Sequence, residues 1–319
     1  MNIEEELPYS VGALLYCPAT NERLAEHVAQ GAFGKPYSLA LCLEDSIGDT
    51  AVEQAEAQTV ETLRLLKQYR EEGAFYLPKI FIRVREPEQI GRLLAAIDAS
   101  LVTGFVLPKF CERNAEAYLR QMEEGEASLG RRLYAMPILE SRELTDLRRR
   151  RKELFRVKDY LDGAGEQILN IRVGGNDLCN VFGIRRHWRD TIYDMGPVAD
   201  ILKDIVAVFS RDYVVSGPVW EYFSGEGWQE GLRRELRLDR LNGFVGKTVI
   251  HPNQIAVVNE SLMVDAADRD DAERILGWGE GEGLMVEKNA SSQRMTEVKT
   301  HGRWAKRTAI LARIYGVRG

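Results

Sequence analysis

Short apolar runs alternate with longer amphipathic segments along almost the whole chain. The runs are rich in aliphatic and aromatic residues and are bounded by Gly, Pro or polar residues, which favours β-strands. Eight such runs occur, at 12–17, 38–43, 79–84, 104–108, 132–139, 167–173, 213–217 and 246–250. Segments with apolar residues at helical spacing lie between them, such as 50–70 and 87–100, and the proline that opens the second suits a helix start.

Several of the strand runs are apolar without alternation, which is typical of parallel strands buried on both faces. Eight strand–helix units predict an α/β protein with a (β/α)₈ TIM barrel of about 250 residues. We therefore expect a barrel domain over residues 1–265 and a C-terminal helical extension over 266–319. In that extension, 277–293 is a Gly-rich, charged linker or lid and 296–316 a helix. A doubly wound open sheet is the alternative, but no G-x-G-x-x-G follows the first strand.

Composition narrows the classes of partner. The 319 residues carry 43 Lys and Arg against 49 Asp and Glu, a net charge of −6, which argues against a nucleic-acid or anionic-membrane protein. The acidic N-terminus does not resemble a secretory signal, and no run approaches the roughly 18 apolar residues of a membrane helix. We expect a cytoplasmic protein whose four cysteines are buried thiols; a catalytic thiol at Cys17 is the alternative, although no basic neighbour in sequence would activate it.

Polar and charged residues follow nearly every predicted strand. In TIM barrels the chemistry lies at these carboxyl ends, so the residues there are candidates for the active site. They are Asn21 after the first strand, Glu44 and Asp45 after the second, Arg83 and Arg85 at the third, Lys109 after the fourth, Glu140 after the fifth, Gly175, Asn176 and Asp177 after the sixth, and His251 after the eighth.

Carboxylates that converge with cations have a chemical meaning. Glu140 and Asp177 are hard oxygen ligands suited to Mg²⁺, which takes one or two protein carboxylates and leaves positions for water and substrate. Such a metal polarises the carbonyl of a 2-oxo acid, and Arg83 is placed to hold the carboxylate or the developing oxyanion. Taken singly, each carboxylate is also explained as a helix N-cap or a surface ion pair.

These motifs resemble those of the citrate lyase β-subunit-like branch of the HpcH/HpaI aldolase superfamily. LLYCPATNERL resembles the family's Phe-Val-Pro strand, LCLEDSIGD its L-E-D-[AS]-V and FIRV its R-[VI]-N. GFVLPKF, PILES, GGNDL and GKTVIHPNQI resemble its V-L-P-K, E-[TS], G-x-x-D-L and G-K-x-x-I-H-P-x-Q-I segments. The seven motifs occur in the family's order and span most of residues 11–260.

The resemblance implies roles for single residues. Glu140 and Asp177 match the family's ligands for Mg²⁺, with Mn²⁺ as the other metal considered, and Arg83 matches its oxo-acid-binding arginine. Glu44, Asp45 and Lys109 match residues of the same pocket and are expected to be catalytic. Gly175 and Asn176 fall in the G-x-x-D-L segment and are expected to bind substrate. His251 is a candidate base, with a positioning role as the preferred alternative.

The sequence also departs from the family pattern. Arg85 stands where the family commonly has asparagine, adding a cation that is expected to bind a more highly charged substrate. A basic cluster after Asp177 is either an anion-binding site or a solvated helix face: Arg185, Arg186, His187 and Arg189. The tail resembles a divergent group found with tellurium-resistance clusters.

Together these features predict a Mg²⁺-dependent carbon–carbon bond lyase or aldolase that acts through a metal-stabilised enolate of a 2-oxo-acid-like or acyl substrate. A Schiff-base aldolase using Lys109 and a non-catalytic metabolite-binding barrel are the alternatives. The expected partner is a small anionic substrate, phosphorylated or a coenzyme A thioester. The resemblance also implies a homo-oligomer, a trimer or hexamer, in which His301 and Arg303 belong to a lid over a neighbour's site; a helix docked on its own barrel is the alternative.

Overall fold

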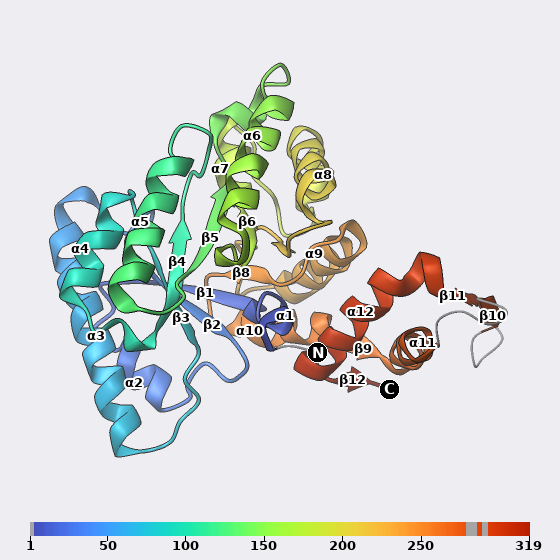
Figure 1. Cartoon of the computed structure of the whole chain (residues 1–319), viewed down its shortest axis with the longest axis horizontal. Helices are drawn as coiled ribbons and strands as arrows, with labels where there is room; N and C mark the ends of the chain where they lie inside the picture. Colours follow the sequence, from blue (N-terminus) through green and yellow to red (C-terminus); the bar gives the residue numbers. More distant parts are fainter. Residues whose placement is uncertain (1–2, 279–285, 289–292) are drawn as a thin grey trace. The chain divides into compact units, whose positions relative to one another are not determined.

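The computed structural model describes residues 3–278, 286–288 and 293–319 (Figure 1). The chain forms two compact units: the larger comprises Val11–Val258, and the smaller comprises Asn259–Gly319 together with the first ten residues. The sequence predicts that the barrel domain ends at residue 265, whereas the larger unit ends at Val258, seven residues earlier. The N-terminal residues belong to the same unit as the C-terminal segment.

The larger unit contains all eight expected strands, paired in parallel in the order β7-β6-β5-β4-β3-β2-β1-β8. A parallel bridge between Gly217 and Lys247 joins the two outer strands, and the Gly217 N–H donates to the carbonyl of Gly246 at 3.0 Å. The predicted (β/α)₈ barrel is therefore confirmed. Its strands are β1 Ala13–Pro18, β2 Ser38–Cys42, β3 Lys79–Arg83, β4 Val102–Leu107, β5 Tyr134–Leu139, β6 Ile171–Val173, β7 Val215–Ser216 and β8 Lys247–Val249.

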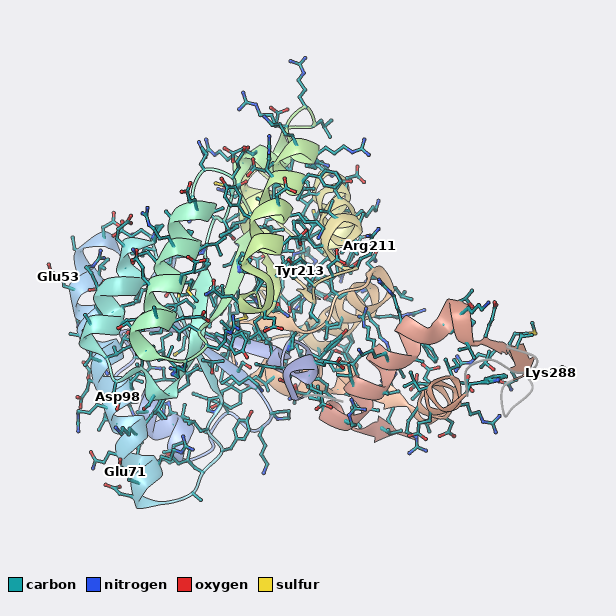
Figure 2. All side chains as sticks on the ribbon, viewed as in Figure 1. Glu53, Glu71, Asp98, Arg211, Tyr213 and Lys288 are labelled. Atoms are coloured by element: carbon teal, nitrogen blue, oxygen red, sulfur yellow. The ribbon has the colours of Figure 1, made fainter. Side chains whose placement is uncertain are left out.

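Helices follow the strands and cover the outside of the barrel (Figure 1). Those expected at 50–70 and 87–100 are α3 and α4, and α3 turns Glu53 and Glu71 to solvent (Figure 2). The helices of this unit are α2 Leu24–Ala29, α3 Val52–Glu72, α4 Glu88–Ala96, α5 Ala115–Leu129, α6 Arg150–Ala164, α7 Gly175–Val181, α8 Gly196–Phe209, α9 Trp228–Asn242 and α10 Asn253–Leu262, which runs across the division.

Buried strands explain why the sequence forms a barrel. All five residues of β2 are buried, and β3 and β5 each expose only their first residue in part, so side chains on both faces of these strands leave water. At Gly104 in β4, an added Cβ would lie 1.8 Å from the carbonyl oxygen of Tyr134 in β5. Only glycine permits this close approach of the two backbones.

A fully buried ionic network ties β8 to α9. The Lys247 ammonium donates to Glu235 at 2.8 Å and to Asp239 at 2.7 Å, and Arg186 donates to both oxygens of Glu235 at 2.7 and 2.6 Å. Tyr193 donates to the second oxygen of Asp239 at 2.8 Å. Neither alternative given for the basic cluster describes Arg186, because its side chain is buried away from solvent and its charge is paired with Glu235.

The smaller unit has its own small core, formed by Ala272, Ile275 and Ala305 with Trp304 against them. The expected helix at 296–316 is α12, whereas the expected linker at 277–293 lies largely outside the described residues. His301 accepts the Glu297 N–H at the start of α12, and its role in a lid stays a prediction. The elements are α1 Ile3–Glu6, β9 Val264–Asp265, α11 Ala266–Gly277, β10 Val286–Lys288, β11 Met295–Glu297, α12 Val298–Tyr315 and β12 Val317–Arg318.

None of the helices described is both long and apolar enough to cross a membrane.

Candidate active site

A cavity of about 370 Å³ lies in the barrel, where the carboxyl ends of the strands meet. Six of the eleven residues predicted at the strand ends line it: Asp45, Arg83, Glu140, Gly175, Asn176 and Asp177. These six residues come from four different segments of the sequence, each at the carboxyl end of a strand. The cavity therefore has the position expected of a TIM-barrel active site.

Arg83, the last residue of β3, is the central cation of this cavity. Its Nη2 lies 2.5 Å from Glu44 and 2.7 Å from Asp45, and the Glu140 carboxylate is 3.8 Å away. The guanidinium also lies over the ring of Tyr16, 5.2 Å from its centroid. Among the described residues, nothing accepts a hydrogen bond from its buried Nε. The Nη2 end of the Arg83 guanidinium is thus held by two carboxylates, while its Nε–H remains available to donate to a ligand.

Lys109 holds this arrangement from outside the cavity. Its ammonium contacts Glu44 and, at 3.4 Å, Asp45, while its backbone N–H donates to Glu140 Oε1 at 3.0 Å. It is the one non-glycine position in the described chain with a positive φ, 50°, and such backbone strain is typical of functional sites. Burial acts to lower the pKa of Lys109, but the carboxylates outweigh it and raise the pKa, the opposite of what a Schiff-base amine requires.

Glu140 follows β5 and is only 5% exposed. Burial raises the pKa of its carboxyl to about 8 despite the charge of Arg83, and repulsion from Asp177 adds to the rise. The side chain rests against Gly174, where an added Cβ would lie 1.7 Å from Glu140 Oε2. The absence of a side chain at position 174 makes the space that Glu140 occupies.

Asp177 lies in the first turn of α7, which begins at Gly175 after β6. Gly175 is packed so closely that a Cβ there would lie 2.6 Å from Ile192 and 2.7 Å from Pro218. The Asn176 side-chain oxygen accepts from Arg186 at 3.3 Å. This packing and hydrogen bonding fix the turn that carries Asp177 into the cavity.

The donor set fits a divalent cation. Two repelling carboxylates, Glu140 and Asp177, face one cavity, and a bound cation would relieve both the repulsion and the cost of burying Glu140. Residues 3–278, 286–288 and 293–319 contain no group of three or more His, Cys, Asp or Glu side chains arranged around a metal. A two-carboxylate site completed by water and substrate suits Mg²⁺ better than a fully protein-built cage.

Besides Glu44 and Lys109, which contact Arg83 and Glu140 respectively, three further predicted residues do not line the cavity: Asn21, Arg85 and His251. Arg85, expected to bind substrate, donates to the carbonyls of Leu43 and Ile47 and pairs with Asp49, so it clamps the loop that carries Glu44 and Asp45. Arg85 does not line the cavity, because β3 ends at Arg83 and the chain bends at position 85; substrate binding by Arg85 stays a prediction.

His251 lies two residues beyond the end of β8. Its ring stacks on Phe223 with a centroid separation of 4.4 Å, and its Nδ1 accepts the Asn253 N–H at the start of α10. These contacts favour the positioning role over that of a base.

Sequence reasoning missed three polar residues of the cavity wall: Tyr16, Arg172 and Thr248. Arg172 lies in β6 and is buried, and Thr248 Oγ1 accepts hydrogen bonds from its guanidinium at 2.7 and 3.3 Å. The available signal was an arginine inside a run that otherwise reads as a strand buried on both faces.

Comparison with solved structures shows the same fold. A citrate lyase from Burkholderia xenovorans has a TM-score of 0.71 and 15% identity over 97% of this chain and 93% of its own. CitE from Mycobacterium tuberculosis, in complex with magnesium, acetoacetate and coenzyme A, has a TM-score of 0.62 and 18% identity over 97% and 100%. The citrate lyase beta subunit of M. tuberculosis with oxaloacetate and magnesium has a TM-score of 0.55 and 19% identity over 80% and 98%. No curated protein matches the sequence.

The decisive comparison is at the level of the family. The sequence model of the C-C bond lyases of the TIM-barrel fold matches residues 5–317, which is nearly the whole chain. The match covers the whole of the larger unit and most of the smaller one. This chain therefore belongs to the C-C bond lyase family of the TIM-barrel fold and is a carbon–carbon lyase.

Proposed function

We propose that this lyase is Mg²⁺-dependent and acts on a small 2-oxo acid or a related acyl compound. It cleaves or forms the C–C bond made by the carbon adjacent to the carbonyl, the carbon that becomes part of the enolate. The observation that carries the proposal is the convergence of Glu140, Asp177 and Arg83 on one cavity of about 370 Å³. A cavity of that size suits a small acid. The structural relatives crystallised with magnesium and oxaloacetate or acetoacetate support the same substrate class.

Glu140 and Asp177 are the residues that would hold the metal. When bound, Mg²⁺ would supply a Lewis acid that polarises the substrate carbonyl. The Glu140 carboxylate is positioned by a hydrogen bond from the Lys109 N–H and by its packing against Gly174. Asp177 is positioned by its place in the first turn of α7.

Arg83 is proposed to stabilise the oxygen on which negative charge develops. Glu44 and Asp45 hold its Nη2, while its Nε–H has no acceptor within the described chain and is available to the substrate. A charged donor fixed in a buried site needs little reorganisation when charge develops, and this lowers the barrier. Glu44 and Lys109 act through Arg83 as positioning residues.

In the cleavage direction, the substrate hydroxyl loses its proton and becomes the carbonyl of one product. The C–C bond breaks, and its electron pair passes into the carbonyl-activated fragment as an enolate. That enolate then takes up a proton to give the second product. No redox partner is required.

The test compares Glu140→Gln and Asp177→Asn with the wild type, and with Glu166→Gln as a control, because Glu166 is an exposed glutamate outside the cavity. Calorimetry should show Mg²⁺ binding to the wild type and the control but at least about tenfold weaker binding to the two site variants. Unchanged affinity in both site variants would refute the proposed metal site.

Activity is tested by mass spectrometry on 4-hydroxy-2-oxo acids and 3-hydroxyacyl coenzyme A thioesters, following both fragments. We expect cleavage that EDTA abolishes and Mg²⁺ or Mn²⁺ restores. Full activity in EDTA would exclude the metal-dependent mechanism. Borohydride trapping of a substrate adduct on Lys109 would favour the Schiff-base alternative instead.

The cytoplasmic location and homo-oligomeric assembly stay proposals taken from the sequence and the family resemblance. Light scattering tests the assembly: a monomer at concentrations where activity persists would argue against a lid shared between subunits.

A further inference from the structure

The buried Lys and Arg side chains of this protein differ in whether a carboxylate neutralises their charge. Five Lys or Arg side chains are buried among the described residues, and four of them have a carboxylate no farther than 3.0 Å away: Arg83 with Glu44, Arg150 with Asp204, and Arg186 and Lys247 with Glu235. The fifth is Arg172. It is 1% exposed, and within the described chain it forms no ion pair.

All partners of Arg172 are neutral. Its Nε and Nη2 donate to Thr248 Oγ1 at 3.3 and 2.7 Å, and its Nη1 makes a long contact of 3.4 Å to the side-chain oxygen of Asn170. The hydroxyl of Tyr16 lies beside the guanidinium. The five N–H donors of a guanidinium exceed what these acceptors satisfy.

A buried charge without a counterion is costly, which is why buried charges in proteins are normally paired. Arg172 is not sealed in the core, however, because it forms part of the cavity wall. A ligand in the cavity can therefore supply the missing negative charge.

The position of Arg172 separates it from the metal carboxylates. Its contacts run to Thr248 in β8 and Tyr16 in β1, neither of which pairs with β6, whereas Glu140 follows β5, which is paired with β6. Tyr16 stands between the two arginines, since its ring lies under Arg83 and its hydroxyl beside Arg172. The cavity thus has two poles, one formed by Arg83 with the carboxylate pair and one formed by Arg172.

We infer that Arg172 binds a second carboxylate of the substrate, at the end remote from the group held by Arg83 and the metal ligands, so that the lyase acts on dicarboxylates. This inference rests on the proposed function, which supplies the first pole. Arg172 is then a specificity-determining residue that selects dianionic over monoanionic acids of the same length.

The experiment uses ligand pairs that differ only in the second carboxylate: fresh oxaloacetate against 2-oxobutanoate, and 2-oxoglutarate against 2-oxopentanoate. Calorimetric titrations in excess Mg²⁺ compare the full-length wild type with Arg172→Met and Arg172→Lys. Arg185→Met is the matched control, because Arg185 is 81% exposed, pairs with Glu221 and lies outside the cavity wall.

In the wild type and in Arg185→Met we expect one dicarboxylate to bind roughly 10- to 100-fold more tightly than its partner, the gain of a charge-assisted hydrogen-bonded pair. Arg172→Met should remove this preference and leave monocarboxylate binding within about threefold, a range well below that gain. Arg172→Lys, which keeps the charge but not the planar fork, should keep part of the preference. If Arg172→Met does not fold, an undiminished preference in Arg172→Lys overturns the inference.

Two further results would overturn it. One is a wild type without preference in either pair. The other is an Arg172→Met variant that loses affinity equally for both members of a pair, which would show that Arg172 holds the single carboxylate common to both. Failure of the proposed function looks different, since the wild type would then bind neither monocarboxylate nor Mg²⁺.

Discussion

Gly174→Ala is a sharp test of how the fold positions the site. An alanine Cβ would lie 1.7 Å from Glu140 Oε2 and 2.5 Å from Glu140 Cβ, whereas ordinary contacts begin at 3.4 Å. The alanine Cβ and Glu140 Oε2 must therefore move apart by about 1.7 Å to reach an ordinary contact distance. Because the root of the Glu140 side chain is also too close, a rotation of its carboxylate is not enough.

Such overpacking costs about 1–3 kcal/mol, which lowers Tm by about 2 to 10 °C for a domain of this size. If Glu140 holds the metal as proposed, its displacement by more than about 1 Å should weaken Mg²⁺ binding by about tenfold or more. Differential scanning fluorimetry and calorimetry measure the two effects.

The control is Gly163→Ala near the end of α6, where an added Cβ meets nothing within 4 Å. That change should be neutral or stabilising by about 0.5–1 kcal/mol, because alanine is the better helix former. A Gly174→Ala protein that matches this control in both Tm and Mg²⁺ affinity would refute the reasoning.

Three other predictions concern stability. Lys247→Met should lower the free energy of unfolding in urea by about 3–5 kcal/mol, because Glu235 and Asp239 are left buried without their cation; a small effect, like that expected for the exposed Lys203→Met, would contradict it. A hydrogen bond from Lys67 holds the pKa of Asp98 at about 2, so the pair stabilises the folded state above about pH 4, the unfolded pKa, and this contribution is lost as pH falls through 2. The wild type and Lys67→Met should therefore differ in stability near pH 6 and converge on acidification, and a constant difference would argue against the pair. Finally, Mg²⁺ at about 100 times its Kd should stabilise the wild type by about 2.7 kcal/mol in thermal unfolding, and no shift would speak against metal binding to the folded state.

Arg83 and Arg85 are close in sequence, but the structure places their side chains in different environments. Arg83 lies in the predicted strand 79–84 and Arg85 directly after it, and the sequence predicts that both bind the substrate. Side-chain alternation would place positions 83 and 85 on the same face if the strand continued, but β3 ends at Arg83. The next residues turn, and Arg85 reaches the carbonyls of Leu43 and Ile47 instead of the cavity.

The eight strand–helix units and the residues at their carboxyl ends could be predicted from the amino-acid pattern, because hydrophobic period and strand-end position are local properties of the chain. Glu140, Asp177 and Arg83 could therefore be predicted to lie together, and all three line the cavity. Which buried cations have a carboxylate partner within the protein could not be predicted from the sequence, because the partners come from distant segments that the fold brings together. Arg172 and Lys247 both lie within strands and both are buried, yet Lys247 meets Glu235 from α9 while Arg172 meets only neutral groups and the cavity. Closure of the barrel brings these distant partners together. The presence or absence of a carboxylate partner distinguishes a cation that serves the fold from one that is available to a ligand.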